Sequence, residues 1–487
     1  MGLKKQVIKG MSWQAFAEIA AQIIRTITTI VLARILFPED FGLVAMAGVF
    51  TGFASTINEI GLSAAIIQRK KVSEAQKSSA FWLNLGEGVV IFLIMAAISG
   101  FIARFYHEDV LKLIVIVSST SFIISSLGTI HRALLMRKLL FKQLSIRNIL
   151  GIFIYGASAI SLGLIGYGYW SLIFAGLIGS LYSSMSLWFI IKWRPKLIFK
   201  WESIKQLMRF GFSYFGSKIF NYITTNVDNL LIGRLLGASS LGIYSISYRL
   251  ALAPAQKVSS VISNVTFPAY SKIQDQKDRF LAAFLKVSRN IEFISYPLLF
   301  GLFATAPEFI KVVYSERWVE AIIPLQILCL AGAMKIIGTT YSSVLLAKGK
   351  TNLIFRISIF RTIFTLLAVF AGIKLGGIIG AAAAMSIIFF IFVLIFLFIT
   401  TRLINMKLIQ YATIVFPFVC ASSIMAFAIF IFRFLNNNYF RLSDLAFLII
   451  SVIIGGLIYY LTIYILKRES IAEFFQIVRS VFSKRKS

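Results

Sequence analysis

The chain has 487 residues, of which 59% are hydrophobic, and its formal net charge is +30. With a mean hydropathy of +0.86, this composition excludes a soluble globular protein and leaves no polar stretch long enough for a soluble catalytic domain. The charge could suit nucleic acid, but the cations lie in short segments between apolar runs, which is the pattern that orients a membrane protein. We therefore expect an all-α integral membrane protein that is not an enzyme.

Apolar runs of spanning length recur along the chain and predict about fourteen transmembrane helices. An N-terminal six-helix lobe occupies 1–191, with spans near 11–36, 41–67, 79–104, 110–134, 146–166 and 168–191. A basic cytoplasmic linker, 192–209, leads to a C-terminal six-helix lobe at 210–401, with spans near 210–236, 241–267, 285–307, 320–345, 352–373 and 376–401. Two extra transmembrane helices, near 410–432 and 444–466, lie within 402–466, and a basic cytoplasmic tail, 467–487, has the pattern of an amphipathic surface helix.

A short repeat links the two predicted lobes. The paired segments are Ile30–Leu36 with Phe41–Leu43, and Leu230–Leu236 with Leu241–Ile243. Each copy ends an apolar helix near an Arg and opens the next helix with a Gly, Gly42 or Gly242. Because six spans separate the copies, they have the same orientation, which predicts parallel repeats as in secondary transporters.

The Lys and Arg residues gather in alternate loops, which places both termini in the cytoplasm. One of these cytoplasmic loops is predicted to hold Arg132, Arg137, Lys138, Lys142 and Arg147. The opposite loops contain the acids Glu39, Asp40, Glu108, Asp109 and Glu316.

Polar residues inside the first span fall on one helical face, since they are spaced by three or four positions: Gln14, Glu18, Gln22, Arg25 and Thr29. They could form a polar seam against a neighbouring helix or the wall of a hydrophilic cavity. The cavity is favoured, because a dry seam would have to satisfy these groups without water.

Cations outnumber acids within the predicted spans, which suits an anionic substrate, and Arg matches phosphate with a bidentate fork. The candidate substrate-binding cations are Arg25, Lys218, Arg249 and Lys335. The candidate cavity or ion-coupling residues are Gln14, Glu18, Gln22, Glu59, Glu87, Asn221 and Asp228. No catalytic residue, metal site or cofactor is expected, although a Na⁺ or H⁺ gradient could drive the process.

Several blocks of the sequence resemble the polysaccharide transporter family, most of all its exporters of colanic-acid and teichuronic-acid type. The blocks are Asp228–Gly237, Leu241–Tyr244, Tyr248–Leu250, Pro254, Pro268–Gln274, Pro38–Gly42 and Gly61–Gln68, within roughly residues 1–400. This resemblance implies membership of the multidrug/oligosaccharidyl-lipid/polysaccharide exporter superfamily, with two six-helix lobes forming a V around a central cavity.

The resemblance also implies a function. The protein would flip undecaprenyl-pyrophosphate-linked oligosaccharide repeat units across the bacterial inner membrane by alternating access, for surface polysaccharide biosynthesis. Its partners would be this lipid-linked substrate and membrane lipids, with a polymerase or export machinery as a further candidate, and not nucleic acid. A lipid II-type flippase, a cation-coupled multidrug exporter and a non-transporting scaffold remain open, although a path for cationic drugs should be richer in acids.

Overall fold

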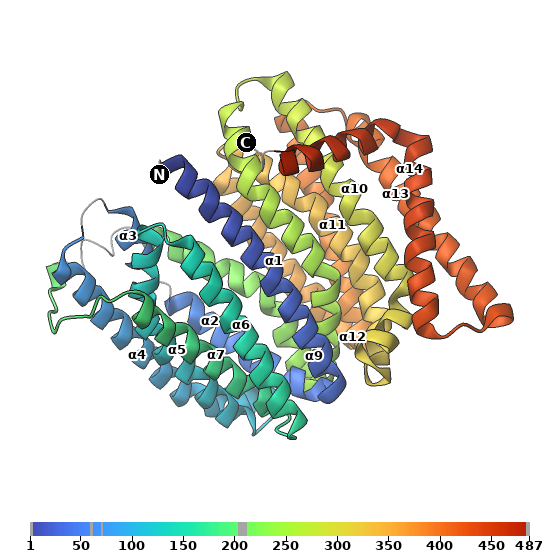
Figure 1. Ribbon diagram of the computed structural model, residues 1–487. Coiled ribbons are helices and arrows are strands. Elements are labelled where there is room, and N and C mark those ends of the chain that lie inside the picture. The colour runs from blue at the N-terminus through green and yellow to red at the C-terminus, as the bar shows by residue number, and fades with distance from the viewer. Residues whose placement is uncertain (1–2, 59–61, 70–71, 203–211, 484–487) are drawn as a thin grey trace. The chain divides into compact units, whose positions relative to one another are not determined.

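The computed structural model describes residues 3–58, 62–69, 72–202 and 212–483, and nearly all of them are helical (Figure 1). Within these ranges the side chains of 3–9, 11, 58, 62, 64, 212–220, 253–268 and 474–483 are not described. These ranges contain no β-strand. Helices are the expected solution for apolar runs in lipid, because each helix satisfies its own backbone hydrogen bonds.

The chain divides into two compact units, Met1–Gly242 and Ile243–Ser487. Unit 1 contains α1 (Leu3–Ile35), α2 (Pro38–Asn58), α3 (Leu62–Gln68), α4 (Glu74–Tyr106), α5 (Leu111–Arg137), α6 (Phe141–Leu164), α7 (Tyr169–Ile190) and the first part of α9 (Phe212–Lys272). Unit 2 contains the rest of α9, α10 (Lys277–Phe309), η1 (Ile310–Tyr314), η2 (Glu316–Ala321), α11 (Ile322–Ala347), α12 (Thr351–Leu403), α13 (Leu408–Leu435), η3 (Asn436–Phe440) and α14 (Asp444–Ser483). The lobe boundaries predicted from the sequence stay predictions.

Twelve helices in the described ranges are long and apolar enough to cross a membrane. Three of them are interrupted: α9 at Gly237 (φ 83°), α12 at Gly376 and Gly377 (φ 56° at Gly377), and α14 at Lys467. Only glycine enters this left-handed region without strain. The two glycine breaks fall at boundaries between predicted spans, so α9 and α12 each correspond to two predicted spans. The prediction of an all-α, multi-pass membrane protein is confirmed.

Several helix boundaries differ from the prediction; α4 and α10, for example, begin at Glu74 and Lys277 rather than near 79 and 285. The predicted span 41–67 corresponds to α2, which ends at Asn58, and the separate short helix α3. The predicted span 146–166 begins earlier, because α6 starts at Phe141. The segment from Phe141 to Arg147 contains no Gly or Pro, so nothing in it stops the helix from extending into polar residues.

In unit 1, α4 packs on α5, α5 on α7, α7 on α6, and α6 on α1 (Figure 1). Close helix approach depends on small residues. A β-carbon on Gly156 of α6 would overlap the buried hydroxyl of Thr28 on α1. His131 on α5 is buried and stacks on Trp188 of α7, with ring centroids 4.7 Å apart.

The first part of the predicted linker lies against α4. Residues 191–200 form no helix, yet the buried hydroxyls of Ser78 and Ser79 accept from the backbone N–H groups of Lys196 and Lys200, at 3.1 and 2.9 Å. The indole of Trp82 donates to the Lys196 carbonyl at 2.8 Å. We call residues 192–201 the strap.

A reciprocal pair of contacts joins α2 to α9 within unit 1. A β-carbon on Gly42 would overlap the backbone carbonyl of Ala238, and a β-carbon on Gly242 would overlap that of Pro38. The two glycines occupy matching positions in the 200-residue repeat, as do Pro38 and Ala238. Each copy therefore presents a glycine to a carbonyl of the other copy.

Unit 2 centres on α10, which packs against α11, α13 and α14, while α11 packs on α12. Its buried core includes Phe284, Tyr341, Tyr411 and Phe418. Polar contacts fix α13 and α14 to α10. The Tyr411 hydroxyl donates to the carboxyl of the fully buried Glu292 at 2.7 Å, and the Tyr459 hydroxyl donates to the Phe293 carbonyl at 2.8 Å.

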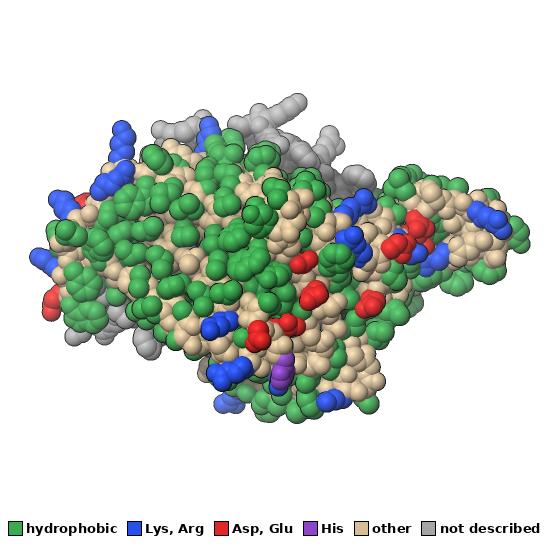
Figure 2. All heavy atoms as spheres, turned by 90° about the horizontal axis from the view of Figure 1, so that it is seen from below, with side chains coloured by type: hydrophobic (Ala, Val, Ile, Leu, Met, Phe, Trp, Pro, Cys, Tyr) green, Lys and Arg blue, Asp and Glu red, His purple; other side chains and the backbone are tan. Residues whose placement is uncertain are grey.

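The surface carries many large hydrophobic side chains, as Figure 2 shows for one face. Examples are Phe101 on α4, Phe153 on α6, Leu367 on α12 and Phe427 on α13, which are more than half exposed. Soluble monomers rarely expose apolar areas of this extent. These surfaces are the ones expected to face lipid.

Candidate functional site

The polar face predicted on α1 is largely open. Gln14, Glu18 and Arg25 are exposed and Gln22 is half-buried. The Arg25 guanidinium lies 3.4 Å from the Glu18 carboxylate, two turns away on the same face. Both side chains are about half exposed, at 44% and 52%, so this pair stays hydrated and adds little to stability.

A polar cavity of about 460 Å³ lies where this face of α1 meets α5 and α6. Its polar lining consists of Gln14, Glu18, Arg132, Ser145, Arg147 and Asn148. Two of the predicted cavity residues, Gln14 and Glu18, thus share one cavity with two arginines that sequence reasoning assigned to a loop. Because the lining carries two guanidinium groups and one carboxylate, the cavity has an excess of positive charge.

Arg147 is held in place by α7. Its Nε donates to the Ser183 carbonyl at 2.8 Å, and the side chain is half-buried. This bond uses one of the five N–H donors of the guanidinium and leaves its charge unchanged. The remaining donors are therefore available to a ligand in a fixed orientation.

Arg147 also borders a second cavity of about 460 Å³, between α6 and α7. This second cavity is lined mainly by hydrophobic side chains, among them Ile146, Leu150, Met185 and Phe189. Phe189 is 81% exposed, so the groove opens at the surface of unit 1. One arginine therefore stands between a polar cavity and an apolar groove.

Arg132 and Arg147 were missed as site residues because they were counted as loop cations, although they lie at the ends of the predicted spans 110–134 and 146–166. The structure places Arg132 within α5 and Arg147 within α6. The signal that could have revealed them is the unbroken run of helix-forming residues from Phe141 onward, which carries Ser145, Arg147 and Asn148 into a helix.

The other predicted residues of unit 1 lie on α9 and α4. Asn221 is exposed, and Asp228 is buried with one carboxylate oxygen accepting from the Asn229 N–H at 2.9 Å. Glu87 is half-buried and accepts from the Asn84 side chain at 3.4 Å. The side chain of Lys218 and the whole of Glu59 lie outside the described residues.

In unit 2, Lys335 on α11 lies between two aromatic rings. Its ammonium is 5.8 Å from the ring centroid of Tyr248 and 5.7 Å from that of Phe389, which are cation–π distances. Arg249, next to Tyr248 on α9, is exposed. Lys335, Tyr248 and Phe389 thus form a cationic and aromatic cluster within unit 2.

The described residues contain no group of three or more His, Cys, Asp or Glu side chains placed to hold a metal ion. Cys329 and Cys420 are both free thiols. The roles predicted for the individual site residues stay predictions.

Comparison with protein families and with individual proteins points to the same kind of protein. Residues 31–323, more than half of the chain, match the family described as polysaccharide biosynthesis protein. The teichuronic acid biosynthesis protein TuaB of Bacillus subtilis (strain 168) is 29% identical over 465 residues, covering 94% of this chain and 95% of TuaB. The lipopolysaccharide biosynthesis protein WzxC of Escherichia coli (strain K12) is 29% identical over 390 residues, or 78% of either chain.

Among solved structures, the lipid II flippase MurJ in an inward closed conformation is similar, with a TM-score of 0.74. The match covers 94% of this chain and 99% of MurJ, at 19% sequence identity. At this identity the likeness establishes a shared fold.

Proposed function

Because this chain belongs to the family of polysaccharide biosynthesis proteins, we propose that it flips polyprenyl-pyrophosphate-linked oligosaccharides from one membrane leaflet to the other. The family membership confirms the resemblance seen in the sequence, and it makes the chain a membrane transport protein rather than an enzyme. The substrate would be a repeat unit of a surface polysaccharide, carried on undecaprenyl pyrophosphate.

The position of Arg147 is the observation that carries this proposal. A lipid-linked sugar has a polar head, an anionic pyrophosphate and a long apolar tail. The polar cavity beside Arg147 suits sugars, the guanidinium suits the pyrophosphate, and the groove of Leu150, Met185 and Phe189 suits a polyprenyl chain. Arg132 adds a second cation on the cavity side.

The predicted cations would extend this path. Arg25 lies on the same face of α1 as Gln14 and Glu18, and its exposed guanidinium could accept the head group after it leaves Arg147. In unit 2, Lys335 and Arg249 would contact the anionic group at another stage of alternating access, and Lys218 would do the same on α9. Asp228 and Glu87 are candidates for ion coupling to a Na⁺ or H⁺ gradient.

The proposed location is the bacterial cytoplasmic membrane, with both termini in the cytoplasm. The alternation of cationic and acidic loops supports this orientation. Fusing a reporter that is active on only one side of the membrane to each terminus tests it, and activity on the external side would reverse the assignment. A polysaccharide polymerase or export complex is the expected protein partner.

The central experiment measures lipid-linked repeat units on the cytoplasmic side of a strain lacking this gene. Complementation is compared for the wild type, Arg147→Gln, Arg132→Gln and the groove variant Phe189→Ser, at matched expression. Lys142→Gln is the control, because Lys142 lies on the same helix, faces the ring of Trp13 and lines neither cavity.

Accumulation in the deletion strain, rescue by the wild type and Lys142→Gln, and failure of the Arg147 and Phe189 variants would support both the function and the site. Full rescue by both variants would exclude the site but not the function. No accumulation, with unchanged surface polysaccharide in a strain that has no second flippase, would exclude the function.

A further inference from the structure

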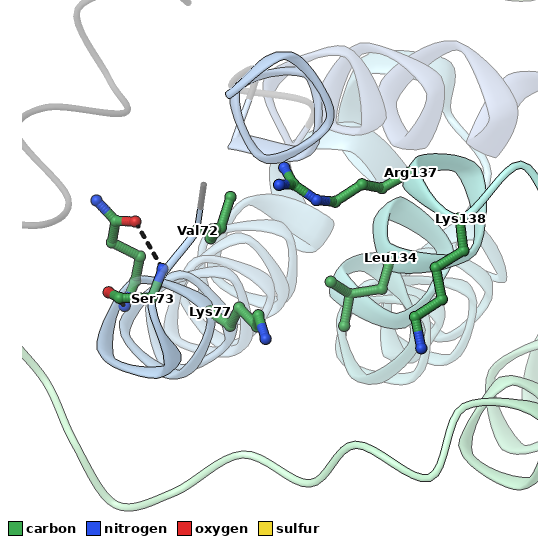
Figure 3. A pocket seen from close by; sticks show the side chains of 7 residues that line it. Val72, Ser73, Lys77, Leu134, Arg137 and Lys138 are labelled. Atoms are coloured by element: carbon green, nitrogen blue, oxygen red, sulfur yellow. Dashed lines mark hydrogen bonds between the residues drawn. The ribbon is translucent and has the colours of Figure 1, made fainter. Parts of the chain in front are cut away.

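A third cavity, of about 720 Å³, lies in unit 1 between the first turn of α4 and the last turn of α5 (Figure 3). Among the described residues its lining contains the cations Lys77, Arg137 and Lys138, and no acidic side chain. It shares no lining residue with the polar cavity or the apolar groove at Arg147. The transport path proposed above therefore does not account for it.

Local hydrogen bonds hold the walls of this cavity. Ser73 and Gln76, which also line it, form a reciprocal capping box at 3.0 and 3.2 Å that starts α4. The Arg137 guanidinium donates to the Ile66 carbonyl at 2.8 Å and also to the Arg69 carbonyl. Carbonyl oxygens orient the guanidinium without neutralising it.

The charge balance at this cavity is positive. Lys77 pairs with Glu74 at 2.6 Å, and the same carboxylate accepts from the Trp193 indole at 2.8 Å. Glu74 thus offsets one of the three cations. Lys138 is exposed, and Figure 3 shows its side chain and that of Lys77 on opposite walls of the cavity. An anion between them would meet Lys77, Arg137 and Lys138.

The residues of the strap indicate where this cavity lies relative to the membrane. Leu197 is 89% exposed, and Phe199 and Trp201 are more than half exposed, while Lys196 and Lys200 alternate with them. The strap is fixed to α4 through Ser78 and Ser79, which directly follow Lys77. Exposed aromatic and aliphatic side chains among cations, at the end of a membrane-crossing helix, are typical of the interface with an anionic bilayer.

We propose that the cavity between α4 and α5 binds the phosphate head group of an anionic phospholipid. Lys77 and Lys138 supply ammonium groups to the phosphate, and Arg137 supplies a fixed positive charge behind them. The strap inserts Leu197, Phe199 and Trp201 among the neighbouring lipids. This lipid is a bound component of the membrane, distinct from the transported substrate.

The test uses the full-length protein, purified and stripped of lipid in detergent, and titrated with phosphatidylglycerol or phosphatidylcholine under native mass spectrometry. We expect the wild type to prefer phosphatidylglycerol. The double variant Lys77→Gln/Lys138→Gln should bind it about thirtyfold more weakly, since each cation contributes roughly 1 kcal/mol at an anionic lipid surface. The control is Lys112→Gln, an exposed cation at the opposite end of α5, which should bind like the wild type.

The possible outcomes separate the sources of the phosphate. Equal binding of the two lipids, or unchanged phosphatidylglycerol binding in the double variant, would overturn the proposal. Binding of inorganic phosphate as tight as that of the lipid would identify a site for free phosphate instead. If the double variant fails to fold, Lys77→Arg/Lys138→Arg keeps the charge and should keep the preference, and soluble glycerophosphoglycerol should compete for the wild-type site.

Discussion

Arg433 on α13 donates to both carboxylate oxygens of Glu308 on α10, at distances of 2.7 and 2.6 Å. The two side chains are only 19% and 10% exposed, and the guanidinium also lies over the rings of Phe430 and Phe447. This bidentate pair joins α13, one of the two extra helices, to α10 at a partly buried position.

Removing one partner should destabilise the protein, because the remaining charge stays in a position where water cannot solvate it fully. We expect Glu308→Gln to lower the free energy of unfolding by about 3–5 kcal/mol. Replacing both residues by leucine should recover most of that loss. Thermal unfolding of the purified variants measures this, with Lys311→Gln as the control, since Lys311 pairs with the exposed Glu316 at 3.4 Å. Additive losses in the double variant would contradict the prediction.

The reciprocal glycines should tolerate no added side chain. Gly42→Ala and Gly242→Ala each place a methyl group on a backbone carbonyl that no rotamer change can move, so each should destabilise unit 1 by about 1–3 kcal/mol. The control is Gly100→Ala on α4, where a β-carbon meets nothing within 4 Å. Apparent melting temperatures from fluorescence-detected gel filtration compare the three, and a Gly42→Ala protein as stable as Gly100→Ala would contradict the contact.

Glu108, in the turn between α4 and α5, should make stability depend on pH. Partial burial, followed by the nearby charges of Glu39 and Asp109, raises the pKa of this carboxyl above its ordinary value of 4.5. Its contribution to stability is therefore complete below pH 4.5 and is lost as the pH rises through the raised native pKa. Glu108→Gln should match the wild type near pH 4 and melt at a higher temperature at pH 7.

The control for this prediction is Glu320→Gln, an exposed carboxyl in η2. The melting temperatures of the wild type and both variants are compared at pH 4 and at pH 7. A Glu108→Gln protein that gains as much at pH 4 as at pH 7 would show that the effect is not electrostatic.

The strap should come loose when its two anchoring hydroxyls are removed. In Ser78→Ala/Ser79→Ala the backbone N–H groups of Lys196 and Lys200 lose their acceptors, so trypsin should cleave at these lysines several-fold faster. Ser99→Ala is the matched control, because Ser99 is buried on the same helix and its hydroxyl donates to the Ala96 carbonyl of that helix. Limited proteolysis followed by mass spectrometry of the fragments gives the rates, and equal rates would show that the strap is held by other contacts.

The sequence was sufficient for the helices and for part of the polar cavity. Apolar length and cation alternation predict the spans, and a three-to-four spacing places Gln14 and Glu18 on one face of α1. Periodicity reports only which face a residue occupies on its own helix. Which helix stands opposite depends on tertiary packing, so the contributions of Arg132 and Arg147 and the groove of Leu150 and Phe189 required coordinates.

The contacts of the strap with α4 are a second feature that the sequence could not predict. Its basic composition predicts a cytoplasmic connection, and the serines that hold it look in sequence like ordinary small residues of an apolar helix. Their hydroxyls acquire a role only because a segment more than a hundred residues away passes over them.

The contacts of Gly42 with Ala238 and of Gly242 with Pro38 have the geometry of an isologous interface, in which residue i meets residue j and j meets i. A chain of half this length, with a proline and a glycine at the positions of Pro38 and Gly42, would form both contacts by dimerising with a second copy of itself. In this respect the two copies of the repeat pack like the subunits of a homodimer, although they belong to a single polypeptide. Joining the copies frees each of them to acquire different side chains elsewhere, as long as both glycines stay small.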